Sequence, residues 1–123
     1  MDLSLGEGDT PPLVKSKLGK ELGVKLYLKN ETANPTWSFK DRGTFLAVSY
    51  AVKAGYKAIG TVSTGNMAAS VAAYAARAGL KAKILVSESA SEEKLKTVSV
   101  YGADVIRVRG RLRKALLREP GAG

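Results

Sequence analysis

The loop around Lys40 holds a lysine in a position where it could act as a nucleophile. Ser38, followed three residues later by Asp41, resembles a capping box, which predicts a helix that begins near Phe39. Lys40 then lies in the first turn, where the partial positive charge of the helix end disfavours a cation. Arg42 adds a second cation, and both effects favour the neutral amine that attacks a carbonyl to form a Schiff base. The alternative is an exposed lysine without a role, and spacing alone does not decide between the two.

A second polar loop, Ser63-Thr64-Gly65-Asn66, follows a short apolar run and precedes an alanine-rich stretch. This order places the loop between the carboxyl end of a strand and the start of a helix, where open α/β sheets bind ligands. Small polar side chains, a glycine and free helix N–H groups form a cradle for a carboxylate or a phosphate. Ordinary capping by Ser63 or Thr64 explains this loop equally well. Together, an amine nucleophile and an anion site suit an amino-acid enzyme that uses an aldehyde cofactor.

The elements that must position these loops follow a repeat marked by glycines. Gly55, Gly79 and Gly102 each end an alanine-rich or amphipathic stretch and precede a short β-rich run. A glycine just past a helix caps its last carbonyls, so the pattern indicates βαβ units of a parallel sheet. The predicted fold class is α/β, with a parallel four-stranded sheet flanked by helices on both faces and an extended N-terminal arm. We expect strands at 24–29, 58–62, 82–87 and 104–108, and helices at 41–54, 66–78 and 92–101.

Composition limits both the chemistry and the partners. The 123 residues include no His and no Cys, which excludes His bases, thiolate nucleophiles, disulfides and Cys or His metal sites. The net charge of +9 is concentrated at 107–123, which holds six basic residues and one acidic residue. Since no aromatic residues alternate with these charges, we expect no nucleic-acid partner. No apolar run approaches the ~18 residues of a membrane span and the N-terminus lacks a signal-peptide core, so we expect a cytoplasmic protein without a membrane partner.

The same patterns predict the domain organisation. Residues 1–23, with two glycines and a Pro pair in SLGEGDTPPL, form an extended N-terminal arm. Residues 24–109 form the α/β domain. Residues 110–123 form a basic tail that we expect to be poorly ordered.

Several segments resemble threonine synthases, which are fold-type II pyridoxal-phosphate (PLP) enzymes. The matching segments are SLGEGDTP (4–11), LYLKNETANPTWSFKDRG (26–43), GTVSTGNMAASVAAYAARAGLKAKILV (60–86) and, more weakly, KLKTVSVYGADVIRV (94–108). The resemblance implies that the sheet is the small domain of such an enzyme, which converts O-phospho-L-homoserine and water to L-threonine and phosphate. Threonine dehydratases and serine racemases are the alternative within the same fold type, but they usually carry an aliphatic residue at the position of Asp41, which favours threonine synthases.

The resemblance also implies roles for particular residues. Lys40 would bind PLP covalently and then move protons during catalysis, and Phe39 would pack beside the cofactor. Asn66 would hydrogen-bond the 3′-oxygen of PLP. The amino-acid substrate would be held by its carboxylate at Ser63, Thr64, Gly65, Asn66 and Met67.

Two features depart from the family pattern. Position 37 is Trp where the commonest pattern has Gly, so the indole lines the site, intrudes on it or packs in the core. The chain is also much shorter than family members and holds no Gly-rich loop for the PLP phosphate. We therefore expect a truncated N-terminal part of the enzyme. A non-catalytic α/β module that self-associates as a homodimer to cover its apolar surface is the alternative.

Overall fold

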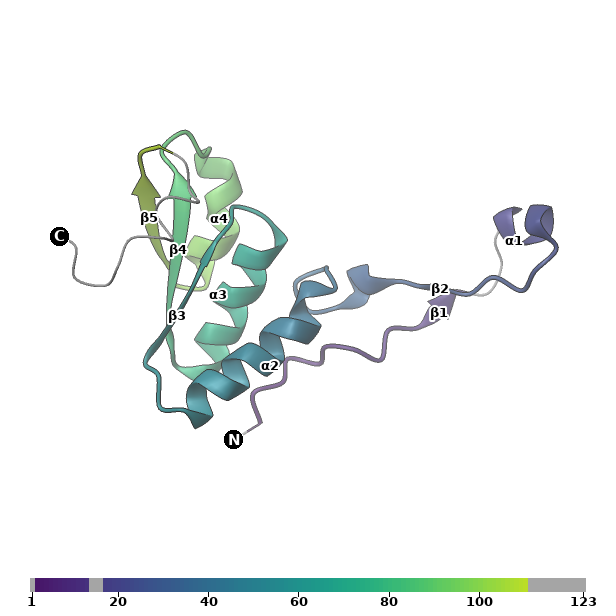
Figure 1. Ribbon diagram of the computed structural model, residues 1–123, viewed down its shortest axis with the longest axis horizontal. Coiled ribbons are helices and arrows are strands. Elements are labelled where there is room, and N and C mark those ends of the chain that lie inside the picture. Colours follow the sequence, from purple (N-terminus) through teal and green to yellow (C-terminus); the bar gives the residue numbers. More distant parts are fainter. Residues whose placement is uncertain (1, 14–16, 111–123) are drawn as a thin grey trace.

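The computed structural model describes residues 2–13 and 17–110, which form an N-terminal arm and an α/β unit (Figure 1). The elements are β1 (Pro12–Leu13), α1 (Lys17–Leu22), β2 (Leu28–Lys29), the 3-10 helix η1 (Glu31–Ala33), α2 (Lys40–Lys53), β3 (Ala58–Val62), α3 (Asn66–Ala78), β4 (Lys81–Ser87), α4 (Glu92–Val100) and β5 (Asp104–Val108). No helix in this described part is long and apolar enough to cross a membrane. Nearly all of the predicted tail at 110–123 lies outside the described residues.

The α/β unit is built on a parallel sheet of three strands in the order β3-β4-β5. In its register, Thr61 lies opposite Ile84, and Ile84 lies opposite Val105. The prediction of a fourth parallel strand at 24–29 is wrong. Leu28 pairs with Leu13 instead, in an antiparallel ribbon of β1 and β2 that belongs to the arm. A β-rich sequence indicates an extended segment, but the partner of that segment is set by tertiary packing.

The described helices cover one face of the sheet. α3 and α4 pack on the same side of the strands, and α2 packs against α3 beside them (Figure 1). Ala82 and Ile84 of β4 point into this interface and are buried, whereas Lys81 and Lys83 on the opposite face are exposed. The prediction of helices on both faces is therefore wrong for residues 2–13 and 17–110. The buried cluster on the covered face consists of Ala68, Val71, Ala72, Ile84, Val86, Leu95 and Val98.

The three repeated glycines end their helices as the sequence predicts. Gly55, Gly79 and Gly102 have φ values of 83°, 72° and 77°. This left-handed conformation lets the chain turn from each helix into the next strand. After α3, for example, the N–H of Leu80 donates to the carbonyl of Ala75 at 2.9 Å. The glycine spacing therefore sets where each βα unit of the sheet begins.

The N-terminal segment lies along α2 and α3 before it extends away from the body (Figure 1). Leu3 packs in a second buried cluster with Val48 of α2 and Tyr74 of α3. The Tyr74 hydroxyl donates to the carboxylate of Glu7 at 2.6 Å. Burial and the Glu7 carboxylate raise the pKa of Tyr74. Although burial acts in the opposite direction, hydrogen bonds from Tyr74 and Ser4 lower the pKa of Glu7.

The projecting part of the arm contains the β1–β2 ribbon and α1 (Figure 1). Most of its large apolar side chains are exposed, although monomeric proteins rarely expose many such side chains together. These side chains are Leu13, Leu18, Leu22, Val24, Tyr27 and Leu28.

Candidate active site

The lysine loop lies directly before α2, and Lys40 is the first residue of that helix. Its backbone N–H donates to Ser38 Oγ at 3.3 Å, and its carbonyl accepts from Thr44 Oγ1 at 3.0 Å. The Lys40 ammonium lies 4.9 Å from the centre of the Phe39 ring, which is a cation–π distance. Phe39 is 58% exposed and Lys40 is half-buried, so the Phe39 ring is accessible to a planar ligand.

Asp41 is part of a buried hydrogen-bond cluster, and the predicted capping box is wrong in its pairing. Ser38 Oγ accepts from the N–H of Lys40 in place of that of Asp41, and Phe39, the N-cap residue, makes no side-chain cap hydrogen bond. The Asp41 carboxylate is fully buried and accepts from Thr36 N at 2.7 Å, Thr36 Oγ1 at 2.5 Å and Ser70 Oγ at 2.7 Å. Ser70 Oγ also lies 2.8 Å from Thr44 Oγ1. Because Ser70 belongs to α3, this Asp41 cluster (Thr36, Asp41, Thr44 and Ser70) joins the first turns of α2 and α3.

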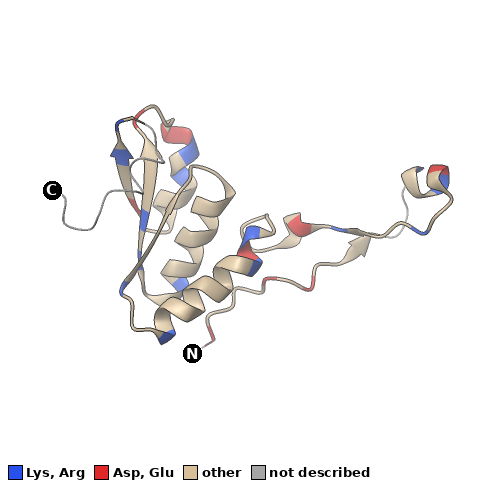
Figure 2. Cartoon of the chain, in the orientation of Figure 1, with Lys and Arg blue, Asp and Glu red and all other residues tan. Residues whose placement is uncertain are grey.

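Arg42 pairs with the arm. Its Nε lies 2.9 Å from Glu31 Oε2 and its Nη2 lies 3.0 Å from Glu31 Oε1. Hydrogen bonds, from Arg42 above all, lower the pKa of Glu31 to about 2, and the same pairing raises the pKa of Arg42. Thr10 Oγ1 donates to Glu31 at 3.0 Å, so the pair connects the arm to α2, where Figure 2 shows acidic and basic residues meeting. The positive charge that the sequence places near Lys40 is thus offset by an acid.

Asn34 fixes the turn that precedes α2. Its buried side chain accepts from the N–H of Gly8 at 2.9 Å and donates to the carbonyl of Glu31 at 2.9 Å. Its own carbonyl accepts from the N–H of Trp37 at 2.9 Å, which closes the turn. This turn holds Trp37 at a φ of 68° with its side chain 76% exposed. The glycine that the family pattern favours at this position would adopt this φ without strain.

The second loop joins the carboxyl end of β3 to α3. Ser63 Oγ accepts from the N–H of Gly65 at 3.1 Å, which stabilises the loop itself. α3 begins at Asn66 with Gly65 as its N-cap, and no side chain of the described residues caps it. The N–H of Ala69 makes the first intrahelical bond, to the carbonyl of Gly65 at 3.1 Å. Like those of other helix starts, the N–H groups of α3 before that of Ala69 have no acceptor within the helix, as the predicted anion cradle requires.

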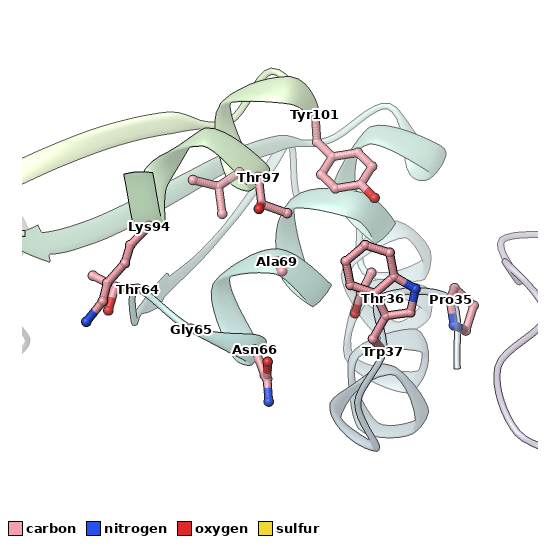
Figure 3. Close-up of a pocket in the computed structure, with 11 residues that line it drawn as sticks. Pro35, Thr36, Trp37, Thr64, Gly65, Asn66, Ala69, Lys94, Thr97 and Tyr101 are labelled. Atoms are coloured by element: carbon pink, nitrogen blue, oxygen red, sulfur yellow. The ribbon is translucent and has the colours of Figure 1, made fainter. Parts of the chain in front are cut away.

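A pocket of about 230 Å³ lies between this loop, the turn before α2 and one face of α4 (Figure 3). The pocket is lined by Pro35, Thr36, Trp37, Thr64, Gly65, Asn66, Ala69, Lys94, Thr97, Val98 and Tyr101. Figure 3 shows the Trp37 indole and the Tyr101 ring pointing toward one another, and Lys94 and Thr64 on the other side of the view. The pocket thus brings both predicted loops together.

The predicted site residues divide into two groups around this pocket. Thr64, Gly65 and Asn66 line it. Thr44 Oγ1, one turn after the start of α2, lies 3.9 Å from Met67 Sδ in the first turn of α3, so the two helix starts are adjacent. The predicted residues outside the lining are Lys40, Phe39, Ser63 and Met67.

Sequence reasoning missed the contribution of α4. Lys94, Thr97 and Tyr101 all line the pocket. Their spacing of three and four residues places them on one face of a helix, and this signal is readable in the sequence. The sequence does not indicate that this face meets the 63–66 loop, because that depends on how α4 packs on the sheet.

The parallel α/β unit, with a lysine at one helix start and a small polar loop before the next, matches a known family of enzymes. The chain matches the family described as pyridoxal-phosphate dependent enzyme over residues 3–121, and it belongs to that family. The structure of serine racemase from Dictyostelium discoideum has a TM-score of 0.78 and 31% identity, over 86% of this chain and 35% of that one.

Within this family, the chain is similar to threonine synthases. It is 47% identical over 115 residues to the threonine synthase of Halalkalibacterium halodurans, which covers 93% of this chain and 32% of the relative. It is 49% identical over 116 residues to the threonine synthase of Methanocaldococcus jannaschii, which covers 93% of this chain and 29% of the relative. The chain therefore spans about a third of the length of the curated relatives it matches.

Proposed function

We propose that this chain forms the lysine-bearing part of a PLP-dependent threonine synthase, which converts O-phospho-L-homoserine and water to L-threonine and phosphate. The main support for the proposal is the Asp41 cluster. It joins the start of α2, which bears Lys40, to the start of α3, whose N-cap residue Gly65 provides no side-chain cap. The similarity to threonine synthases over 93% of the chain supports the choice of reaction.

Lys40 is the proposed nucleophile and proton carrier. When bound, PLP supplies an electron sink for the amino-acid substrate. The Lys40 amine would hold the cofactor covalently, and its Nζ would take and return protons during catalysis. The exposed Phe39 ring beside this amine packs against the planar cofactor. Asn66, at the pocket, donates a hydrogen bond to the 3′-oxygen of the cofactor.

The substrate is proposed to bind through its two anionic groups. The carboxylate accepts hydrogen bonds from the amides at the start of α3 and from the hydroxyls of Ser63 and Thr64, with Gly65 and Met67 beside it. Lys94 is the one basic residue among those lining the pocket, so it is suited to attract the distal phosphate. The two anion-binding groups define the orientation of the substrate.

Reductive trapping tests the role of Lys40. The purified chain is incubated with PLP and reduced with borohydride, and the modified lysines are mapped by mass spectrometry. We expect labelling to be concentrated at Lys40 and lost in Lys40→Ala. The matched control is Lys53→Ala, which removes an exposed lysine at the other end of the same helix and should leave the labelling unchanged. Labelling spread evenly over many lysines would contradict the proposal.

A ligand panel separates the proposed reaction from those of related enzymes. Calorimetry on the same chain compares O-phospho-L-homoserine, L-serine and L-threonine. We expect the phosphorylated amino acid to bind most tightly, and Lys94→Gln to weaken its binding more than that of L-serine, since only the former carries the distal charge. Preferential binding of L-serine would instead favour a serine racemase-like function.

Self-association is a second proposed property, and the exposed apolar side chains of α2 favour it. Leu46 is 67% exposed and Tyr50 is 69% exposed, four residues apart on one face of the helix. We propose that a second copy covers this face in a homodimer. Light scattering should give a dimer mass for the wild type and a monomer for Leu46→Glu. A monomeric wild type at high concentration would refute this second proposal.

A further inference from the structure

Trp37 has a backbone conformation that its side chain makes unfavourable. Its φ of 68° lies in the left-handed region, where a bulky L-residue is strained. The indole is 76% exposed, so burial compensates for little of this strain. The hydrogen bond that closes the turn uses the backbone N–H of Trp37 and the carbonyl of Asn34, and any residue except proline would make it. The turn therefore does not explain why a tryptophan stands at this position.

The indole contributes to the pocket instead. It points toward the ring of Tyr101, the residue that directly follows α4, across the pocket (Figure 3). Tyr101 is 40% exposed, so both aromatic rings retain surface for a ligand. Lys94 and Thr64 lie at the other end (Figure 3). Strained residues gather at binding sites, where the surrounding structure holds them for a role in recognition.

We propose that Trp37 is a specificity-determining residue, whose indole closes, with Tyr101, the end of the pocket opposite Lys94 and limits the bulk of the amino-acid side chain. This inference rests on the proposed function. A substrate whose phosphate lies at Lys94 places its carboxylate at the amides that begin α3, between Lys94 and the aromatic wall formed by Trp37 and Tyr101. The aromatic wall then contacts the amino-acid end of a short substrate and excludes a longer or bulkier one, and contacts of this kind discriminate about 10- to 200-fold.

A stability measurement separates this role from a structural one. Trp37→Asn places a residue that tolerates the left-handed conformation at this position, so we expect Tm to rise by about 2–4 °C. Trp37→Phe keeps both an aromatic ring and the strain, so its Tm should stay within about 1 °C of the wild type. A lower Tm for Trp37→Asn would show that the indole is needed for folding and would overturn the inference.

Binding measurements test specificity with two phosphorylated amino acids of different bulk. The wild-type chain should bind O-phospho-L-homoserine and reject O-phospho-L-tyrosine in calorimetry. Trp37→Asn should bind O-phospho-L-homoserine about tenfold more weakly. Its preference for this compound over O-phospho-L-tyrosine should fall about tenfold, because the indole no longer closes that end of the pocket. Trp37→Phe should remain within about threefold of the wild type.

The outcomes distinguish this inference from the proposed function. If the wild type binds neither compound, the proposed function fails and the inference fails with it. If the wild type binds O-phospho-L-homoserine and Trp37→Asn keeps the same discrimination, only the role of Trp37 is refuted.

Since Trp37 is the one tryptophan of the chain, its fluorescence gives an independent readout. Its emission should change with the same Kd that calorimetry gives, and binding without any change would also refute the role.

Discussion

Replacing Asp41 by alanine is expected to loosen the junction between α2 and α3, because the carboxylate is the acceptor that both helix starts share. It accepts hydrogen bonds from the Thr36 amide, the Thr36 hydroxyl and the Ser70 hydroxyl at 2.7, 2.5 and 2.7 Å, and it is fully buried. Hydrogen bonds to a charged group contribute about 1.5–3 kcal/mol each, and three at one carboxylate are not additive. We therefore expect Asp41→Ala to lower the free energy of unfolding by about 3–5 kcal/mol, a large share of the stability of a small domain.

Asp41→Asn provides the matched control because it preserves the shape of the side chain. Its remaining oxygen can accept from the Thr36 amide, while its NH₂ group can donate to the hydroxyls of Thr36 and Ser70 after these rotate. We expect a loss of about 1–2 kcal/mol for this variant. Ser70→Ala removes one of the three donors and should cost a similar amount.

Urea denaturation followed by circular dichroism measures these differences. With a slope of about 1–3 kcal/mol per molar urea, a loss of 3 kcal/mol or more lowers the midpoint by about 1 M or more. A midpoint for Asp41→Ala equal to that of the wild type would refute the argument. So would equal losses for Asp41→Asn and Asp41→Ala, because the cluster would then act through the charge alone.

Three further variants test the arm and the helix end. The pKa of Glu31 is lowered from 4.5 to about 2, so its contribution to stability is present above pH 4.5 and is lost as the pH falls toward 2. Arg42→Gln should flatten this acid dependence in urea denaturation at pH 2–6, and an unchanged slope would contradict the pairing. Tyr74→Phe removes the donor to Glu7 and should cost about 1–2 kcal/mol at pH 7. Because the pKa of Tyr74 is raised, the wild type should also lose stability above pH 10, and the variant should lack this loss; identical alkaline curves would count against the contact. Gly79→Ala forces a Cβ into a φ of 72° and should lower the unfolding free energy by about 1–2 kcal/mol, whereas no loss would mean that α3 ends differently.

Much of the fold follows from local chemistry that the sequence displays directly. The strands expected at 58–62 and 104–108 and the helix expected at 66–78 have those bounds in the structure. Glycines such as Gly79 set the ends of the helices, because glycine adopts a positive φ without strain. The 63–66 loop follows from the same local pattern, because small polar residues between a strand and a helix lie at the ligand-binding edge of a parallel sheet. The Lys40 loop follows from a pattern typical of a helix start.

The partners of the charged residues are set by tertiary packing and not by spacing along the chain. The spacing of Ser38 and Asp41 indicated a local cap, but Asp41 bonds to Ser70, which lies 29 residues away on α3. Arg42 likewise pairs with Glu31 of the arm. A buried carboxylate takes whichever donors the packed helices bring to it, since leaving it unsatisfied costs more than breaking a local pattern.

The sequence by itself determined the order of strands and helices from 41 to 108, the glycine ends of those helices and the two loops, because these depend on neighbours along the chain. Only the tertiary structure decided that residues 28–29 pair with 12–13 of the arm and that one face of α4 meets the 63–66 loop. Strand partners and pocket walls depend on which surfaces bury the most apolar area together. The packing of the described chain as a whole decides which surfaces meet. For this reason only the fold identifies Lys94 and Tyr101 as pocket residues.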